Sequence, residues 1–312
     1  MFYTFAFYSI LFFKSDLKPV VEYSFLSNLL NIDLSLIPRN YLILLSIVMA
    51  YIQIVLFFGM IRKYGLTNDQ SLISAFIYIT LTGFYPGMII ISPSSISFFI
   101  LIFAIYNLFL TYDIEFPLQK FFFVSLYIGI GSLYYAPLCI FLLFLIVALP
   151  ALKTPTIREF LIIIIGFLLP FYFLALYFVM TDHIQTFYQM ILENIPGSYN
   201  IQFEGNILLM IPLIYAVILF LLSFMKYFFQ SGSRTIRIII YNRILITCIV
   251  FSAAAFVIIP ANRWHIGPYI LAPVSVYIGN MLADDSRKIF NQVAFSLLLL
   301  VAIFSEYIYY NL

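Results

Sequence analysis

YLILLSIVMAYIQIVLFFGMI occupies residues 41–61, and the basic pair Arg62-Lys63 follows it directly. The run contains no charged residue. A helix that crosses a bilayer needs roughly 20 consecutive apolar residues, because only a helix satisfies its own backbone hydrogen bonds in hydrocarbon. The stretch therefore predicts a transmembrane helix that ends where the charges meet the membrane surface.

Comparable apolar runs fill the rest of the 312 residues, which are 64% hydrophobic and only 9% charged. A soluble domain carries about 25% charged residues, since water must wet its surface. The runs are continuous, so the alternating pattern of a membrane β-barrel is absent from them. The expected fold is an all-α, polytopic transmembrane helical bundle of about eleven spans, forming a single integral membrane domain over residues 1–312. The predicted spans are 2–13, 41–61, 70–91, 95–112, 119–133, 134–152, 160–180, 207–226, 244–260, 266–283 and 289–308.

Two of these spans need separate arguments. Residues 2–13 would make a helix of only about 18 Å, and neither a basic segment before them nor a small-residue cleavage site after them suggests a cleaved signal peptide. A short or tilted first span is therefore expected. Residues 119–152 form either one long helix or two short ones, and Gly129, Gly131 and Pro137 favour a break between two.

The distribution of the fifteen basic residues predicts the orientation. With two crossings in 119–152, eleven fall on one face and four on the other; with one crossing they scatter over both. The positive-inside rule therefore favours eleven spans, with the N-terminus in the cytoplasm and the C-terminus outside. The inner set is Arg62, Lys63, Lys120, Lys153, Arg158, Lys226, Arg234, Arg237, Arg243, Arg287 and Lys288; the outer set is Lys14, Lys18, Arg39 and Arg263.

This topology places the two longest loops, 14–40 and 181–206, on the outer face. Both mix polar residues with apolar ones spaced three and four apart, which is typical of short amphipathic helices lying in the membrane interface. Membrane lipids are the expected partners of these loops, and no nucleic-acid binding is expected.

Acidic and imidazole groups at the outer span ends form the first part of a predicted site. Asp16 follows the first span, and Asp182-His183 follows the seventh. A carboxylate can act as a general base and a histidine can assist it, so Asp16, Asp182 and His183 are the catalytic candidates. The alternative is that charged residues simply gather at span ends, where water can solvate them.

The segment Arg263-Trp264-His265, between the ninth and tenth spans, is the candidate for substrate binding. Arg263 is the only outer basic residue outside the first loop, and a guanidinium can bind a phosphate through two hydrogen bonds. The alternative is anchoring, with Arg263 snorkelling at the interface beside the chain's single Trp.

Other chemistry is not predicted. No metal-ligand spacing, nucleotide-binding loop or GxSxG motif occurs, so neither a metal nor a cofactor is expected. The middles of the spans lack ionisable residues, which argues against an ion-driven pump. Gly83-Phe84-Tyr85-Pro86-Gly87 lies inside the third predicted span and is either a packing kink or an unwound substrate site.

Two resemblances can be stated on these residues. Gly129-x-Gly131-Ser-Leu-Tyr-Tyr-Ala-Pro137, Arg158-Glu159-Phe-Leu-Ile-Ile-Ile-Ile-Gly166-Phe-Leu-Leu-Pro170 and Leu271-Ala-Pro273-Val-Ser resemble an inner-membrane protein family of Bacteroidota that implies no activity. The short first span followed by an acid, the paired middle helices and the outer Arg before a Pro-containing span resemble C-type glycosyltransferases. That resemblance implies a polyprenyl-phosphate sugar donor on the extracytoplasmic face, with Asp16 as the acid and Arg263 as the phosphate ligand. The paired acids typical of the family are missing around Asp16.

The sequence thus predicts a multi-pass protein of the bacterial inner membrane, with C-type glycosyltransferase-like handling of a lipid-phosphate-linked sugar as the leading hypothesis. A non-catalytic subunit or scaffold bound to other envelope membrane proteins, or in a secretion complex, is the rival. A permease for an uncharged or lipidic solute is the third possibility. A lateral groove above the predicted spans 70–91 and 266–283 is the structural feature that would distinguish them.

Overall fold

The computed structural model describes residues 38–67, 71–84, 88, 90–114, 117–152, 155–185, 187–189, 210–230, 235–258, 263–284 and 288–311. Within this part of the chain all regular structure is helical, as expected. Residues 2–13 and most of the loops 14–40 and 181–206 lie outside the described residues. The α-helices are α3 (Arg39–Lys63), α4 (Ser71–Thr82), α5 (Pro93–Leu110), α6 (Leu118–Tyr134), α7 (Ile140–Leu152), α8 (Ile157–Met180), α10 (Met210–Gln230), α11 (Ile236–Ile258), α12 (Gly267–Leu282) and α13 (Lys288–Asn311).

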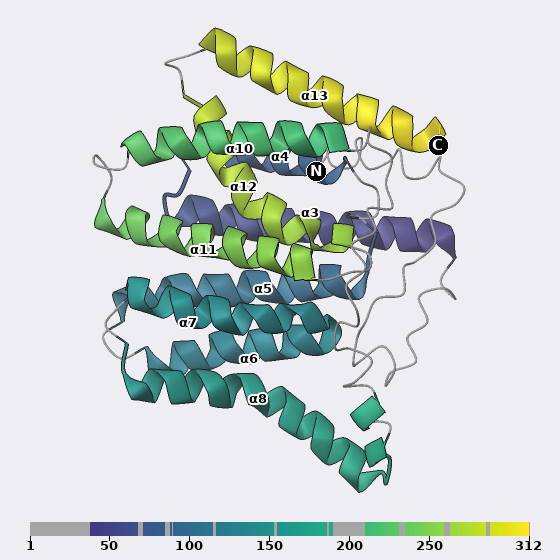
Figure 1. The fold of residues 1–312 in the computed structure, drawn as a ribbon, viewed down its shortest axis with the longest axis vertical. Helices are drawn as coiled ribbons and strands as arrows, with labels where there is room; N and C mark the ends of the chain where they lie inside the picture. Colours follow the sequence, from purple (N-terminus) through teal and green to yellow (C-terminus); the bar gives the residue numbers. More distant parts are fainter. Residues whose placement is uncertain are drawn as a thin grey trace.

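The helices lie side by side and run back and forth across the molecule, with α13 and α8 at opposite edges (Figure 1). Contacts link α8 to α6, α6 to α5, α7 to α11, α11 to α12 and α12 to both α4 and α10. In the described part of the chain, five helical segments are long and apolar enough to cross a membrane, which fits the expected helical membrane protein. They are Asn40–Lys63, Pro93–Leu110, Ile157–Met180, Ile211–Phe229 and Ile236–Ile258.

The predicted break in residues 119–152 is present. Helix α6 ends at Tyr134, Tyr135 is extended (φ −142°, ψ 97°), and the short 3-10 helix η5 (Ala136–Cys139) leads into α7. Proline at the second position of η5 has no N–H to continue the helix. Figure 1 shows α7 returning alongside α6.

The third predicted span differs from the structure. Helix α4 ends at Thr82 instead of continuing to residue 91, so it is only 12 residues long, or about 18 Å. Gly83 and Phe84 form a turn, and the chain reaches the N-cap of α5 at Ser92. Gly83 therefore directly follows the end of the helix, where a glycine lowers helical stability.

Glycines set the closest helix packing. A Cβ on Gly129 of α6 would lie 2.6 Å from the backbone oxygen of Phe167 in α8, and one on Gly166 of α8 would lie 2.8 Å from the backbone oxygen of Phe122 in α6. Small residues let the two backbones approach this closely, as is common in membrane bundles. Beyond this contact α8 bends away from α6 (Figure 1), and Pro170 inside the helix accounts for the bend.

The described members of the inner basic set all lie at one end of the bundle. They occur near the ends of α3 and α10 and in the first turns of α6, α8, α11 and α13, except Arg243, which is the eighth residue of α11. Aromatic rings pack there as well: the Tyr64 ring meets Phe109 and Tyr241 edge-on, and the Arg237 guanidinium lies 5.4 Å from the Tyr112 ring centroid. We call this the basic end, and the other end the opposite end.

Candidate functional site

An apolar cavity of about 300 Å³ opens between α4, α10, α11 and α12. Its walls come from the last turn of α4, the first turns of α10 and α12 and the last turns of α11, so it lies toward the opposite end of the bundle. This volume is at the lower end of the range of small-molecule sites. The lining residues are Leu81, Phe84, Met88, Pro212, Leu213, Ala216, Val217, Phe220, Ile249, Ala253, Phe256, Gly267, Ile270, Leu271 and Val274.

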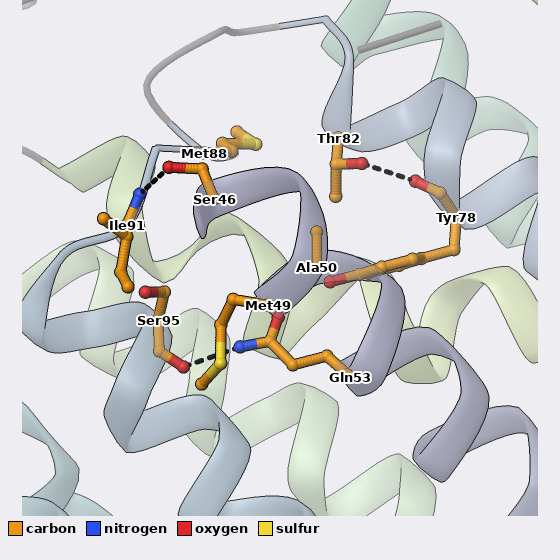
Figure 2. A pocket seen from close by; sticks show the side chains of 9 residues that line it. All are labelled: Ser46, Met49, Ala50, Gln53, Tyr78, Thr82, Met88, Ile91 and Ser95. Atoms are coloured by element: carbon orange, nitrogen blue, oxygen red, sulfur yellow. Dashed lines mark hydrogen bonds between the residues drawn. The ribbon is translucent and has the colours of Figure 1, made fainter. Parts of the chain in front are cut away.

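A smaller, polar pocket lies on the other side of the end of α4 (Figure 2). Its volume is about 10 Å³, enough for about one water-sized group. Ser46, Gln53, Tyr78, Thr82 and Ser95 supply its polar wall, and Met49, Ala50, Met88 and Ile91 complete it. None of the described residues that line it is charged.

Hydrogen bonds from α3 hold the polar pocket in shape. The Gln53 Nε2 donates to the carbonyl oxygen of Ser95 at 2.7 Å, and the backbone N–H of Ile91 donates to the Ser46 Oγ at 2.8 Å (Figure 2). Gln53 is only 5% exposed. Its Oε1 accepts no hydrogen bond from any described residue. Gln53 lines the pocket, so its amide oxygen can accept a hydrogen bond from a donor bound there.

Met88 belongs to both hollows. Leu81 lines the apolar cavity and Thr82 the polar pocket, so the last turn of α4 together with Met88 separates the two. The Met88 side chain occupies the space beside Gly267, where a Cβ would collide with its thioether. A flexible, unbranched side chain therefore forms the movable part of the partition.

The predicted binding segment Arg263-Trp264-His265 borders this region. It forms the 3-10 helix η8 (Arg263–Ile266), which continues directly into α12 and packs against α5 and α11. The side chains of Arg263 and Trp264 are outside the described part of the structure. The Tyr269 hydroxyl, one turn further, donates to the carbonyl oxygen of Ser94 at 2.7 Å and so links the start of α12 to α5.

His265 is 5% exposed, and burial lowers the pKa of its imidazole to about 4. The charged form loses hydration when the ring is removed from water. His265 is therefore neutral near pH 7 and can donate one hydrogen bond and accept another.

Asp182 and His183 are far from this segment. They follow α8, whose end lies at the edge of the bundle, with α5, α6 and α7 between it and α11 (Figure 1). The backbone N–H of His183 donates to the carbonyl oxygen of Phe178 at 3.0 Å and that of Asp182 to Val179 at 3.3 Å. Asp182 has φ +57°. These bonds are those of a Schellman motif, which ends a helix through a left-handed residue.

The structure thus places His265 two residues before Gly267, which lines the apolar cavity, whereas Asp182 and His183 end α8 at the edge of the bundle. Asp16 lies outside the described residues. Among those that are described, no group of three His, Cys, Asp or Glu side chains is arranged to hold a metal ion. Sequence reasoning missed Met88 and the pocket around Gln53, although Gln53 interrupts an otherwise apolar run and this was the available signal.

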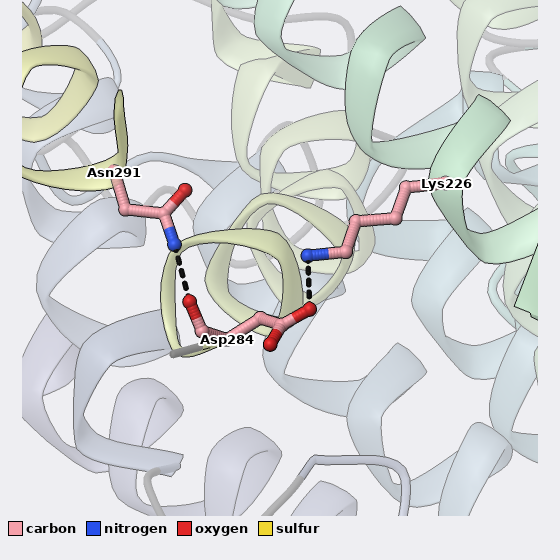
Figure 3. A network of polar contacts seen from close by, with 3 residues as sticks. All are labelled: Lys226, Asp284 and Asn291. Carbon is pink, nitrogen blue, oxygen red and sulfur yellow. Dashed lines mark hydrogen bonds and ion pairs between the residues drawn. The ribbon is translucent and has the colours of Figure 1, made fainter. Parts of the chain in front are cut away.

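A second polar cluster lies at the basic end (Figure 3). Lys226 of α10 forms an ion pair with Asp284, and the Asn291 Nδ2 of α13 donates to the Asp284 backbone oxygen at 2.6 Å. The two charged side chains are 24% and 29% exposed. These residues bond to one another and so connect α10, the end of α12 and α13. We therefore interpret this cluster as structural.

Comparisons of the chain with protein-family models, with curated proteins and with solved structures find no match.

Proposed function

We propose that this protein handles a lipid-phosphate-linked sugar at the extracytoplasmic face of a bacterial inner membrane, in the manner of a C-type glycosyltransferase. The observation that carries the proposal is the apolar cavity between α4, α10, α11 and α12, which lies next to the η8 segment. The proposed topology has eleven spans with the basic end in the cytoplasm. The cavity then falls in the outer half of the membrane.

The parts of such a substrate match the parts of the site. A polyprenyl chain is as apolar as the cavity walls. Its phosphate would lie at the surface beside η8, where Arg263 supplies a cation and neutral His265 a hydrogen bond. Asp16 remains the proposed general base, since Asp182 is placed in a helix-ending turn away from the cavity.

Binding of a photoreactive polyprenyl phosphate to the purified full-length protein tests this proposal. We expect Arg263→Ala to lower photolabelling at sub-saturating probe by about tenfold or more, because one hydrogen bond to a charged group contributes about 1.5–3 kcal/mol. Arg243→Ala is the matched control, since Arg243 is exposed near the basic end of α11. Equal labelling of Arg263→Ala and wild type would contradict phosphate binding by Arg263.

A second pair of variants tests the cavity. Ala253→Phe places a ring in the cavity, whereas Val250→Phe adds a ring to an exposed position of the same helix that does not line it. Only Ala253→Phe should lose labelling. In cells, Arg263→Ala and Asp16→Asn should change the pools of lipid-linked sugars, and unchanged pools would refute a catalytic role. Stable capture of another envelope protein, with unchanged pools, would favour the scaffold alternative.

A further inference from the structure

The polar pocket and the apolar cavity are neighbours, and their chemistry is complementary. Met88 lines both, and the last turn of α4 contributes Leu81 to the cavity and Thr82 to the pocket. We propose that together they form one site for an amphiphile, with its chain in the cavity and one uncharged hydroxyl of its head group at Gln53. This rests on the proposed function only in placing a lipid chain in the cavity.

The polar pocket is what would let the site select one lipid over others with similar chains. Lipid tails are as apolar as the cavity walls, so moving a chain from the bilayer into the cavity gains little free energy. A hydrogen bond in a surrounding of low dielectric constant is stronger than one in water. The Gln53 amide, in a residue that is 5% exposed and lines the pocket, is therefore the group that can distinguish a hydroxylated lipid from other lipids.

The head group bound there is uncharged. The pocket has serine, threonine, tyrosine and glutamine groups on its wall, and among the residues that the structure describes it has no cation to neutralise a phosphate. A hydroxyl donates to an amide oxygen without a net charge, so it satisfies Gln53 at the smallest cost of desolvation.

Two probes that carry the same photoreactive acyl chain test the proposal on the full-length protein in nanodiscs. One is a monoacylglycerol, which is uncharged and bears hydroxyls; the other is the methyl ester, which is uncharged and has no donor. We expect wild type to label several-fold more with the monoacylglycerol. Gln53→Met, which keeps the length of the side chain, should remove that preference and leave methyl-ester labelling unchanged.

Two further variants keep the test decisive if Gln53→Met is unstable. Tyr78→Phe removes one hydroxyl from the pocket wall without changing its shape and should reduce the preference in part. Met88→Ala should raise monoacylglycerol labelling by opening the partition, whereas Met88→Leu conserves volume and should not. Thermal unfolding of each variant shows whether the fold is retained.

The outcomes separate this inference from the proposed function. If Ala253→Phe removes labelling by both probes but Gln53→Met keeps the preference for the hydroxylated one, the polar pocket is a packing feature and this inference is wrong. Equal labelling of wild type by the two probes would also overturn it. If Ala253→Phe affects neither probe nor the polyprenyl phosphate, the cavity is not a lipid site and the proposed function fails with it.

Discussion

Asp182 illustrates how a residue with catalytic chemistry can be explained by backbone geometry. Its φ of +57° places it in the left-handed region, where residues other than glycine, asparagine and aspartate cost about 1–2 kcal/mol. We expect Asp182→Val to lower the free energy of unfolding by that amount. Asp182→Gly should keep or slightly increase it, because glycine adopts this conformation without steric cost. Unfolding in detergent measures both.

The same pair of variants tests the catalytic hypothesis for Asp182. If the residue only ends α8, Asp182→Gly retains the lipid-linked sugar pools of wild type. A glycine variant that is fully folded but has altered pools would return Asp182 to the site.

His265 makes the folding stability of the protein decrease as the pH falls. Burial lowers its pKa from the ordinary 6.5 to about 4, so the unfolded chain binds a proton more readily than the folded one. The neutral His265 ring therefore contributes its full share of the folding stability above pH 6.5, and this share is lost as the pH falls toward 4. We expect His265→Gln to flatten the fall in unfolding temperature between these pH values. A slope identical to that of wild type would show that other groups cause it.

For single residues, the sequence could predict which side chains have catalytic or binding chemistry, but not which of them lie close together in the fold. Asp182-His183 and His265 both lie at span ends, and nothing in their spacing shows that one pair caps a helix at the edge of the bundle while the other lies beside a cavity. Gln53 was visible as a polar interruption of an apolar run, yet its partner Ser95 is 42 positions away. Contacts over such separations depend on helix order, which a single sequence does not contain.

Among the elements, the contact between α6 and α8 is the sharpest to test. Ala at position 129 would bring its Cβ to 2.6 Å from a backbone oxygen of α8, which cannot move like a side chain. We expect Gly129→Ala to destabilise the protein by about 1–3 kcal/mol through overpacking. Gly59 in α3 has no neighbouring atom within 4 Å of such a Cβ, and Gly59→Ala should stabilise by up to about 1 kcal/mol through helix propensity.

Unfolding transitions of the two glycine variants, measured in the same detergent, check this contrast. A loss of stability in both variants would mean that helix packing does not decide whether a Gly→Ala substitution stabilises or destabilises this protein.

Helix positions were largely predictable because apolar runs bounded by charges are strong signals. Helices α3, α5, α8 and α12 begin and end within three residues of the predicted spans. The prediction was wrong for 70–91, where α4 stops at Thr82. A hydropathy average does not detect the end of α4, because the residues that follow it, 83–87, are still largely apolar. Helix α11 starts eight residues before the predicted 244, because Arg237 and Arg243 lie at its basic end, where water can reach them.

For the whole molecule, the clustering of basic residues at one end predicts which surface faces the cytoplasm. Single cysteines test this in a Cys139→Ala, Cys248→Ala background. We expect Phe229→Cys, at the basic end of α10, to react with a membrane-impermeant maleimide only after the cells are permeabilised. Ile184→Cys, after α8, should react in intact cells. Both native side chains are exposed. The reverse pattern would invert the topology, and with it the leaflet that holds the cavity.

Met88 adds a consequence of a different kind, because its sulfur can be oxidised. A thioether converted to a sulfoxide becomes polar and gains a strong hydrogen-bond acceptor, and reductases reverse the change. In the partition between the two hollows, that reaction would turn an apolar divider into a polar one. Oxidation of Met88 would then place a polar group in the wall of the apolar cavity, which would weaken the binding of an apolar chain there.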